Sequence, residues 1–369
     1  MKSAKFYWTF ATWAAAACLA ILFVTPALSA QETKEKITVD DVDRTFMLRL
    51  PKGYDPQHHY PVVILLHGIS QDADDMERLT QFDQLADKDG IIAIYPIALN
   101  GRWNVGVRPQ ERRTMGPGGG RGRHGGGFPG GGYPGGGGGG GGYPRGSGGG
   151  YPGGQQPSGR DSDDDKRPLP ADDVAFISQM LDQVSAKQSV DPARIYAAGL
   201  SEGGFMSLRL GCALGDRLAA VAAVSAAMPK TMTCLPPRPV AVVMINGTSD
   251  PIVHYGGGTE RNLNLEILSV EESAKAWARI DHCSEKPEHS KAPSSKGGTE
   301  AKVDTYTGCR EGAEVVSYSL KGTGNTWPGG MQYEPAEQIG KTSEDFNANE
   351  NLWAFLASKK LPAKSDASQ

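Results

Sequence analysis

The chain has 369 residues and a formal net charge of −4 at neutral pH, with 22% charged and 38% hydrophobic residues. A net negative charge gives no reason to expect a nucleic acid or an anionic membrane as partner. Roughly 290 residues remain beyond an N-terminal segment and a glycine-rich segment, enough to bury a single large core.

The N-terminus has the pattern of a secretory signal. Two lysines precede an apolar run from Ala14 to Val24, and small residues follow up to Ala30. This pattern predicts a signal peptide over residues 1–30, cleaved after Ser29 or Ala30, and therefore a secreted protein, extracellular or periplasmic. A retained membrane anchor is the alternative, but the run is shorter than the roughly 20 residues of a spanning helix.

Residues 31–115 are predicted to form the first part of one domain. The apolar stretches FMLRL, PVVILLHG and GIIAIYP have the length and composition of buried strands, and a helical pattern runs from Met76 to Lys88. Continuous apolar strands that alternate with amphipathic helices predict a mostly parallel sheet with helices on both faces. The fold class expected is α/β.

A low-complexity segment over residues 116–167 interrupts this domain. Residues 116–160 contain about half of the 49 glycines, in repeats such as GGYPGGGG. Such a composition has little to bury and cannot offset the entropy of ordering, so a disordered insertion is expected. It is either a tolerated loop expansion or an adhesive element that contacts a polymer.

Residues 168–361 continue the same pattern, and a flexible tail is expected at 362–369. A helix is predicted to start at Asp172 and Asp173, followed by the strand ARIYAAGLS and the helix GGFMSLRLGCAL. The apolar stretches AAVAAVSA, PVAVVMING and EVVSYSLKG then predict three more strands, before a closing helix from about Ser343 to Leu356. One interrupted domain, rather than two, is expected.

Four cysteines follow the signal peptide: Cys212, Cys234, Cys283 and Cys309. An even number in an exported chain favours disulfides, and four cysteines allow three connectivities. Pairing of sequence neighbours closes the shortest loops, and each bridge would stabilise by about 3 kcal/mol on a chain-entropy argument. Free buried thiols are the alternative, whereas zinc sites use closer spacings than these.

The stretch IYAAGLSEGG places Ser201 between an apolar strand and a helix. This is the strand–turn–helix context of a nucleophile elbow, G-x-S-x-G, in which glycines permit a sharp turn that exposes the serine hydroxyl. The backbone N–H of Glu202 is then one expected oxyanion donor, and the N–H of Ile69, in LLHGISQ, is the second. His67 is expected to shape that loop rather than act as a base.

The acid and the base of such a site should follow the serine in chain order. Asp250, in NGTSDPIVHY after an apolar strand, is the candidate for the acid that orients a histidine; an ordinary Asp-Pro turn is the alternative. The histidine is expected on the loop after the last strand. That loop reads KGTGNTWPGG and has Asn325 at its centre.

Several motifs together resemble a known family. LPKGYDP, PVVILLHGISQDADD, GRWN, VDPARIYAAGLSEGG, NGTSDPIVHYGGG and GNTWPGG are similar to the secreted polyhydroxybutyrate depolymerase and feruloyl esterase family of α/β-hydrolases, itself similar to carbohydrate esterase family 1. The resemblance implies an α/β-hydrolase fold and serine-dependent hydrolysis of carboxylic esters. It implies hydroxyalkanoate polyesters, feruloylated or acetylated polysaccharides, or small aryl esters as substrates, and no metal or other cofactor.

Carried over by position, Ser201 matches the family nucleophile and Asp250 the family acid. The family histidine falls in a loop of the form G-H-x-W-P-G, so Asn325 occupies its place. A second departure is Asn246, where the family commonly has histidine. An amide cannot take the proton of the serine, and loss of a triad histidine costs on the order of a millionfold in turnover.

Three alternatives follow for the chemistry. His254, four residues after Asp250, replaces the missing base, while His282 and His289 are expected at the surface. Or the chain is a catalytically impaired relative that keeps its pocket and binds polysaccharide or polyester. Or altered chemistry survives with Glu202 as the base.

Two tryptophans are candidates for lining the substrate cleft. Trp103 and Trp327 each lie near an expected strand end, where an indole ring could form a wall for an aryl or polymer ester. A tryptophan packed in the core is the alternative for each. The function expected is therefore a serine-type carboxylic ester hydrolase or its impaired relative.

Overall fold

The computed structural model describes residues 29–106, 171–292 and 301–362. Its contacts divide the chain into one unit of residues 1–107 and 172–369 and a second unit of residues 108–171, of which only Ala171 is described. The expected signal peptide, apart from residues 29–30, lies outside the described residues. So do the expected insertion at 116–167 and the expected tail, apart from Pro362.

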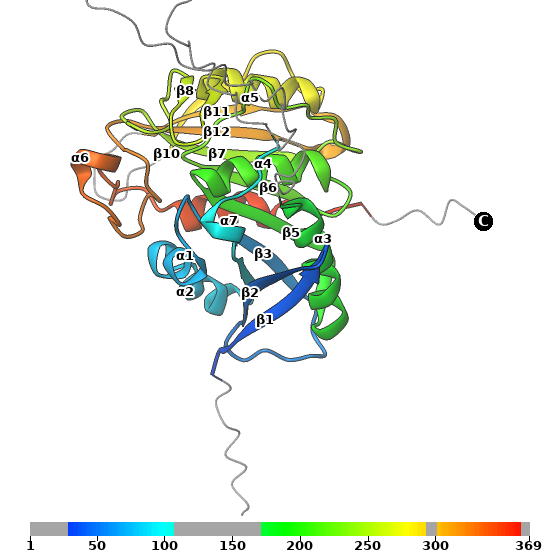
Figure 1. The fold of residues 1–369 in the computed structure, drawn as a ribbon. Helices are drawn as coiled ribbons and strands as arrows, with labels where there is room; N and C mark the ends of the chain where they lie inside the picture. Colours follow the sequence, from blue (N-terminus) through cyan, green and yellow to red (C-terminus); the bar gives the residue numbers. More distant parts are fainter. Residues whose placement is uncertain (1–28, 107–170, 293–300, 363–369) are drawn as a thin grey trace, which may run out of the picture. The chain divides into compact units, whose positions relative to one another are not determined.

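A sheet of ten strands forms the centre of the first unit (Figure 1). In sheet order, the strands are β1 (Gln31–Val39), β2 (Val42–Leu50), β4 (Ile92–Pro96), β3 (Tyr60–Leu66), β5 (Val190–Leu200), β6 (Ala220–Val224), β7 (Ala241–Gly247), β12 (Val315–Leu320), β11 (Ala301–Tyr306) and β10 (Glu288–Ala292). A separate two-stranded sheet pairs β8 (Gly258–Glu260) with β9 (Leu265–Ile267).

The six central strands, from β4 to β12 in sheet order, run parallel to one another. The pairs at both edges are antiparallel, with β1 and β2 at one edge and β11 and β10 at the other. Strands β3 and β4 have exchanged places relative to their order in the chain, and β5 lies beside β3. This is the strand order of an α/β-hydrolase. The predicted fold class is therefore confirmed.

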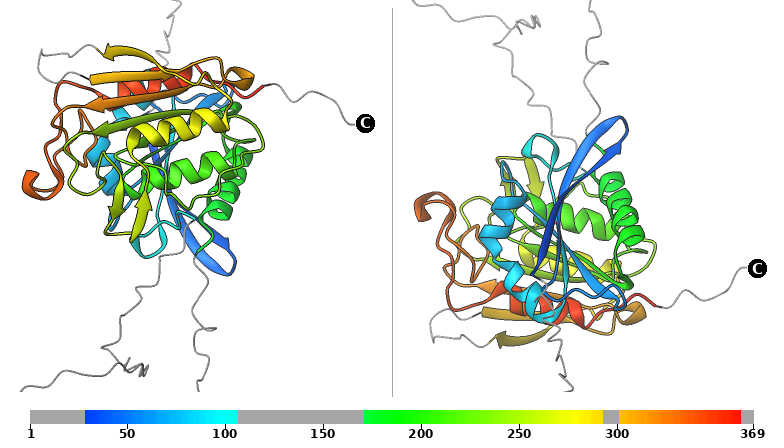
Figure 2. Two further views of the ribbon diagram at one scale, coloured as in Figure 1. Left: turned by 90° about the horizontal axis from the view of Figure 1, so that it is seen from above. Right: turned by 90° about the horizontal axis from the view of Figure 1, so that it is seen from below.

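Helices cover both faces of the sheet. They are α1 (Ala73–Thr80), α2 (Phe82–Asp89), α3 (Asp173–Lys187), α4 (Glu202–Ala213), α5 (Val270–Ile280) and α7 (Ala348–Ala357). The short α6 (Ala336–Ile339) lies in the loop between β12 and α7, and 3₁₀ turns occur at Leu99–Gly101 and Arg310–Gly312. Figure 2 shows α1 and α2 in cyan and α3 and α4 in green on opposite sides of the sheet. Two hydrophobic layers result, one with α3, α4 and α5 and one with α1, α2 and α7.

Strand β3 is apolar from Pro61 to Leu66 because both faces of the sheet are covered. In β3, Val62, Ile64 and Leu66 pack in the layer with α3 to α5, while Val63 and Leu65 pack in the opposite layer. All five side chains are fully buried. This arrangement explains why the sequence shows continuous apolar runs instead of alternation.

Three local features differ from the sequence expectation. The helix expected from Met76 to Lys88 is two helices, because Gln81 adopts a left-handed conformation (φ 51°). The closing helix starts at Ala348 rather than near Ser343, because the Asn347 side chain caps it. The hairpin of β10 and β11 was not predicted, since the residues of β10 are almost all polar and exposed.

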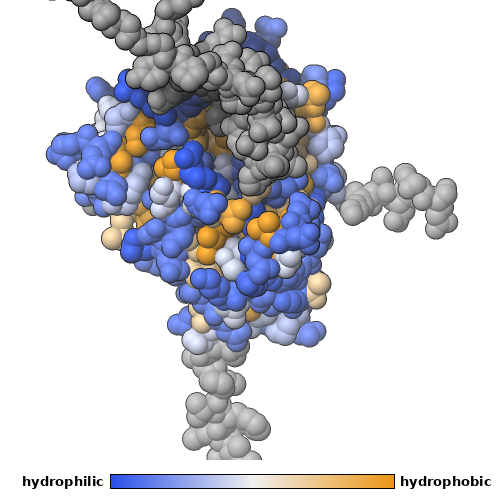
Figure 3. All heavy atoms as spheres, in the orientation of Figure 1, coloured by the Kyte–Doolittle hydropathy of each residue, from blue (hydrophilic) through white to orange (hydrophobic). Residues whose placement is uncertain are grey.

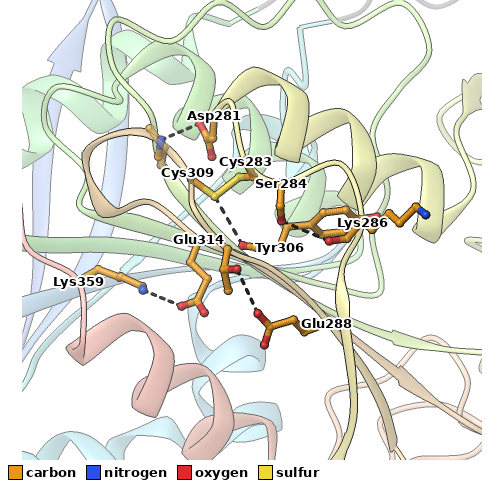
Figure 4. Close-up of a disulfide and its surroundings, with 11 residues drawn as sticks. Asp281, Cys283, Ser284, Lys286, Glu288, Tyr306, Cys309, Glu314 and Lys359 are labelled. Atoms are coloured by element: carbon orange, nitrogen blue, oxygen red, sulfur yellow. Dashed lines mark hydrogen bonds and ion pairs between the residues drawn. A yellow bond between two sulfur atoms is a disulfide. The ribbon is translucent and has the colours of Figure 1, made fainter.

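Both disulfides join the sequence neighbours, Cys212–Cys234 and Cys283–Cys309, which confirms the expected pairing. Figure 4 shows that the second bridge ties the chain after α5 to the chain after β11. Each bridge closes a loop of fewer than thirty residues at the side of the sheet. The α5 region and the antiparallel edge are therefore covalently held together.

The face of the molecule in Figure 3 is mainly hydrophilic, with apolar groups scattered over it. Val42, Leu235 and Met331 are the exposed large hydrophobic residues in the described part of the chain. Across the described ranges, no helix combines the length and the apolar character needed to cross a bilayer.

Candidate active site

Ser201 lies in a sharp turn between β5 and α4. Its backbone angles are φ 53° and ψ −117°, a sparsely populated region that costs a non-glycine residue free energy. The side chain makes no capping hydrogen bond to α4, and 8% of the residue is exposed. The turn thus holds the hydroxyl at the N-terminus of a helix and leaves it available to a ligand.

The glycines beside Ser201 allow backbone segments to approach closely. A Cβ atom on Gly199 would lie 2.1 Å from the carbonyl oxygen of Gly203, and one on Gly203 would lie 2.1 Å from that of Leu66. Such contacts do not occur in real structures, so larger residues at either position would displace the strand or the helix. The G-x-S-x-G spacing is therefore required by packing in this turn.

The loop after β3 leaves one backbone donor open. The N–H of Gly68 donates to Gln71 Oε1, and those of Ser70 and Gln71 donate to backbone carbonyls. In the described ranges no such bond is found for the N–H of Ile69, and Glu202 is in the first turn of α4, where N–H groups have no intrahelical acceptor. Ile69 lines the same cavity as Ser201.

His67 has a structural role in this loop. Its Nδ1 lies 2.7 Å from the carbonyl oxygen of Gly68, and its Nε2 accepts the N–H of Ala98 at 3.0 Å. Nδ1 therefore carries the proton. The ring is fully buried, and burial lowers the pKa of His67, so it stays neutral.

Asp250 lies on the loop after β7, at the same edge of the sheet as Ser201. Its Oδ1 accepts the backbone N–H groups of Ile252 and Val253, both at 2.8 Å. Its Oδ2 accepts a hydrogen bond from the Nδ2 of Asn325 at 2.9 Å. Burial raises the pKa of Asp250 to about 7, although all three hydrogen bonds favour the charged carboxylate.

Asn325 follows β12 and is buried, with 1% of its surface exposed. Besides its bond to Asp250, its Oδ1 accepts the hydroxyl of Tyr333 at 3.2 Å, and its backbone oxygen accepts the same hydroxyl at 3.0 Å. These partners fix the orientation of the amide, with nitrogen toward Asp250 and oxygen toward Tyr333. The group beside Asp250 is therefore a hydrogen-bond donor whose acceptor oxygen is already used.

Glu202 directly follows Ser201, and its carboxylate pairs with Arg102. Its Oε1 accepts the Nε of Arg102 at 3.0 Å, whereas Oε2 is buried with no partner that meets hydrogen-bond geometry in the described residues. Burial raises the pKa of Glu202 to about 7, and Arg102 opposes this shift. The side chain is 2% exposed and does not line the cavity beside Ser201.

The structure does not bring His254 to Ser201. His254 is exposed and is absent from the residues that line the cavity. Both oxygens of Asp250 are occupied by other donors, so no carboxylate orients its ring. His282 is exposed, and His289 pairs with Asp304 at the antiparallel edge of the sheet.

The two tryptophans lie in the packed interior. Trp103 is 4% exposed and donates its Nε1–H to the carbonyl of His67, and Trp327 is fully buried and donates to Asn349 Oδ1. Neither lines the cavity. The expectation of an aromatic cleft wall is corrected on this point, because both indole N–H groups are used to hold neighbouring loops.

Asn246, the second departure from the family pattern, ends β7. Its Nδ2 donates to the carbonyl oxygen of Ala226 at 2.9 Å, and its Oδ1 is buried without a partner among the described residues. The residue is 2% exposed and outside the cavity. It therefore supports the loop after β6 rather than contacting a ligand.

A cavity of about 350 Å³ opens beside Ser201. Its lining is mostly polar: Gly68, Ile69, Ser70, Gln71, Asp75, Arg78, Ser201, Ile252, Asn262, Asn325, Tyr333, Glu334, Gln338 and Ile339. This volume is within the range of small-molecule sites, about 300–1,000 Å³. In the described ranges, no group of three or more His, Cys, Asp or Glu side chains is placed to hold a metal.

Two residues of the site were not predicted from the sequence. Tyr333 orients the amide of Asn325, and Arg102 neutralises part of the charge at Glu202. Tyr333 lies in a polar, irregular stretch with no periodicity, so nothing signalled its position. Arg102 directly precedes Trp103 in the GRWN motif, and an arginine on a loop has no pattern that predicts its partner.

Comparison with known proteins points to esterases. A family model described as "Putative esterase" matches residues 39–115. The "Putative esterase NocK" of Nocardia uniformis subsp. tsuyamanensis is 25% identical over 345 residues, covering 90% of this chain and 84% of that protein. Feruloyl esterase B of Piromyces equi is 31% identical over 183 residues, covering 48% of this chain and 31% of that enzyme.

Among solved structures, an acetyl xylan esterase from Aspergillus awamori aligns with 80% of this chain and 94% of that chain, at 12% identity and a TM-score of 0.48. The match to feruloyl esterase B spans about a third of that enzyme's length. The strand order, the turn at Ser201 and the sequence matches agree. The chain therefore has the strand order of an α/β-hydrolase and is similar to esterases of the carbohydrate esterase family 1 type.

Proposed function

We propose that the chain binds carboxylic esters in the cavity beside Ser201 and hydrolyses them slowly, through an acyl-enzyme on that serine. The observation that carries this proposal is the hydrogen bond from Asn325 Nδ2 to Asp250 Oδ2. It supports an arrangement in which an amide stands in the position of the base of a serine hydrolase. The scaffold for ester binding is kept, and the group that takes the proton is replaced.

The path of the serine proton explains why we propose slow turnover. Attack by Ser201 Oγ on the ester carbonyl forms the acyl bond and releases an alkoxide, which must receive the proton that the serine loses. An imidazole carries that proton, whereas the amide of Asn325 can only donate hydrogen bonds toward the leaving oxygen. The oxyanion hole and substrate binding still accelerate hydrolysis by about 10³- to 10⁴-fold over the reaction in water.

A fluorophosphonate probe and p-nitrophenyl acetate test this proposal. We expect slow labelling of the wild type, no labelling of Ser201→Ala, and turnover far below the roughly 10 s⁻¹ of a median enzyme. Turnover at or above that rate would show that another base serves the site. If the fluorophosphonate does not label Ser201 but the protein binds an ester ligand, only the binding role remains.

A second candidate is an active hydrolase in which Glu202 is the base. It is favoured by the pKa of about 7 at Glu202 and by the unpartnered Oε2 atom, since a base works best near the operating pH. Glu202→Gln separates the two candidates. If Glu202 is the base, this variant loses hydrolysis at every pH; if not, it keeps the slow rate of the wild type.

The polar lining of the cavity favours a sugar ester over a polyester. Asp75, Arg78, Asn262, Glu334 and Gln338 offer charged and amide groups to a ligand, and hydroxyl-rich alcohols satisfy such groups. A hydroxyalkanoate polyester would bury them without partners. Hydrolysis of, or binding to, acetylated or feruloylated oligosaccharides in preference to polyhydroxybutyrate tests this assignment.

We also assign the protein to the outside of the cytoplasm. Two disulfides in the described residues support this, because such bonds persist in oxidising compartments. The predicted signal peptide agrees with it. Fractionation of cells that express the full chain, with detection of the processed N-terminus, tests the assignment.

A further inference from the structure

We infer that the chain carries a second binding site, for an anionic polysaccharide. It lies at the end of the sheet where the parallel strands begin, opposite to the end that carries the candidate active site. Two cavities, of about 490 Å³ and 470 Å³, lie there and share Arg279. Basic side chains line both of them: Arg238, Lys275, Arg279, Lys286 and Arg310, here called the basic surface.

The direction of α5 places this surface away from Ser201. The helix follows β7 and returns along the sheet, so its last turn arrives at the end where the parallel strands begin. Val240, directly before β7, donates its N–H to Asp281, directly after α5. Ser201, Asp250 and Asn325 all follow the opposite ends of their strands. A polymer held at the basic surface therefore leaves the cavity beside Ser201 open.

The cations of the basic surface are only partly neutralised. Arg238 pairs with Glu311 at 3.1 Å, and Glu285 is the other acidic residue lining these cavities. Arg279 and Arg310 are exposed, and neither forms an ion pair with any residue described in the structure. Five cations thus face two carboxylates, in a chain with a net charge of −4.

Two basic residues of α5 lie on one face of the helix. Lys275 and Arg279 are four residues apart, so their like charges are neighbours on the helix surface. The disulfide Cys283–Cys309 and the prolines after Cys234 hold the surrounding loops in place. Lys286 extends away from that disulfide (Figure 4). The disulfide and the prolines therefore hold these charges on a defined surface.

The chemistry of the surface fits carboxylated sugars. Arginine binds carboxylates in a two-pronged geometry, and each cavity is large enough for a small ligand. Leu235, 84% exposed, and Pro236 and Pro237 offer apolar contacts for the C–H faces of sugar rings. A nucleic acid is disfavoured, because its binding surfaces are denser in cations and the sequence pI is about 6.0.

Binding of the full chain to polygalacturonate, measured at low salt, tests the inference. The Ser201→Ala background is used, so the result does not depend on hydrolysis. Arg279→Gln/Arg310→Gln is expected to weaken binding about fivefold or more, and added salt should weaken wild-type binding. Lys34→Gln/Lys88→Gln, which removes two exposed cations elsewhere, is the matched control and should bind like the parent.

Three outcomes would overturn the inference. One is equal binding by the parent and Arg279→Gln/Arg310→Gln. Another is equal weakening in the control pair, which would mean that only total charge matters. The third is tighter binding to double-stranded DNA than to polygalacturonate, which would assign the surface to a different class of polymer. Circular dichroism of each variant confirms that it is folded.

Discussion

Asn325 Nδ2 donates a hydrogen bond to Asp250 Oδ2 at 2.9 Å, and both side chains are buried at the edge of the sheet that carries Ser201. Asp250 therefore has a partner, but the partner is an amide donor that cannot accept the proton of a serine. Asp250 keeps a defined orientation through this bond. With the two backbone N–H groups that bind its other oxygen, neither oxygen of Asp250 is left unpaired.

Asn325→His should raise hydrolysis of p-nitrophenyl acetate by about 10²- to 10⁴-fold. An imidazole beside Asp250 supplies the missing base, but less than the full millionfold is expected because Tyr333 must move to admit the larger ring. Asn325→Gln, which is larger but no base, is the matched control and should give no gain. A folded Asn325→His protein with wild-type activity would contradict this account of the slow step.

His254→Ala should leave the rate of hydrolysis and the rate of fluorophosphonate labelling unchanged. The side chain is exposed and lies outside the cavity, and no carboxylate in the described part of the chain orients it. Initial rates across pH 5–9 for the variant and the wild type provide the measurement. A fall of tenfold or more, in a variant of unchanged stability, would restore His254 as the base.

Tyr333→Phe should lower the free energy of unfolding by about 1–3 kcal/mol. Its hydroxyl satisfies two oxygens of the buried Asn325, and both lose their donor in the variant. Denaturant titration measures the change. Tyr318→Phe is the control: it is half-buried, and no hydrogen bond to its hydroxyl is found among the described residues. Equal stability loss in both variants would mean that the hydrogen bonds of Tyr333 contribute nothing.

Gly203→Ala should cost 4 kcal/mol or more, on the order of the largest single-residue effects, or prevent folding. The added Cβ atom would lie 2.1 Å from the carbonyl oxygen of Leu66 and 2.5 Å from that of His67. Gly256→Ala, whose Cβ atom would meet nothing within 4 Å, should change stability by less than about 0.5 kcal/mol. A soluble Gly203→Ala protein of normal stability would rule out the close approach at the Ser201 turn.

Asp281→Asn should flatten the dependence of stability on pH. Burial raises the pKa of Asp281 from 3.8 to about 7, so the folded state binds more protons than the unfolded state in that window. Its contribution to stability is therefore full at low pH and is lost as pH rises through 7. Asparagine does not titrate and keeps an acceptor for Val240.

The variant should gain roughly 1–3 kcal/mol relative to the wild type between pH 4 and pH 8. The difference between the two proteins isolates Asp281, because carboxylates with lowered pKa values, such as Asp87, act equally in both. Urea titrations at a series of pH values provide the measurement. Parallel stability curves would show that Asp281 titrates as an exposed acid.

Periodicity and turn chemistry determined the architecture from the sequence alone. The uninterrupted apolar run of β3 and the glycines around Ser201 can be satisfied only by a strand covered on both faces and by a tight strand-to-helix turn. The disulfide pairing followed from loop length. The hairpin of β10 and β11 was not visible, because a polar edge strand has neither alternation nor an apolar face.

The roles of the side chains at the site were decided only by tertiary structure. Trp103, Trp327 and His254 each lie close in sequence to an expected site residue, yet two are buried in the packed interior and one is exposed outside the cavity. Sequence spacing fixes the direction of a side chain along a strand or helix, but on a loop the packing of distant segments sets it. The sequence therefore determined that an amide stands where the resemblance predicts an imidazole, and the fold decided that no histidine of the described residues lines the cavity beside Ser201.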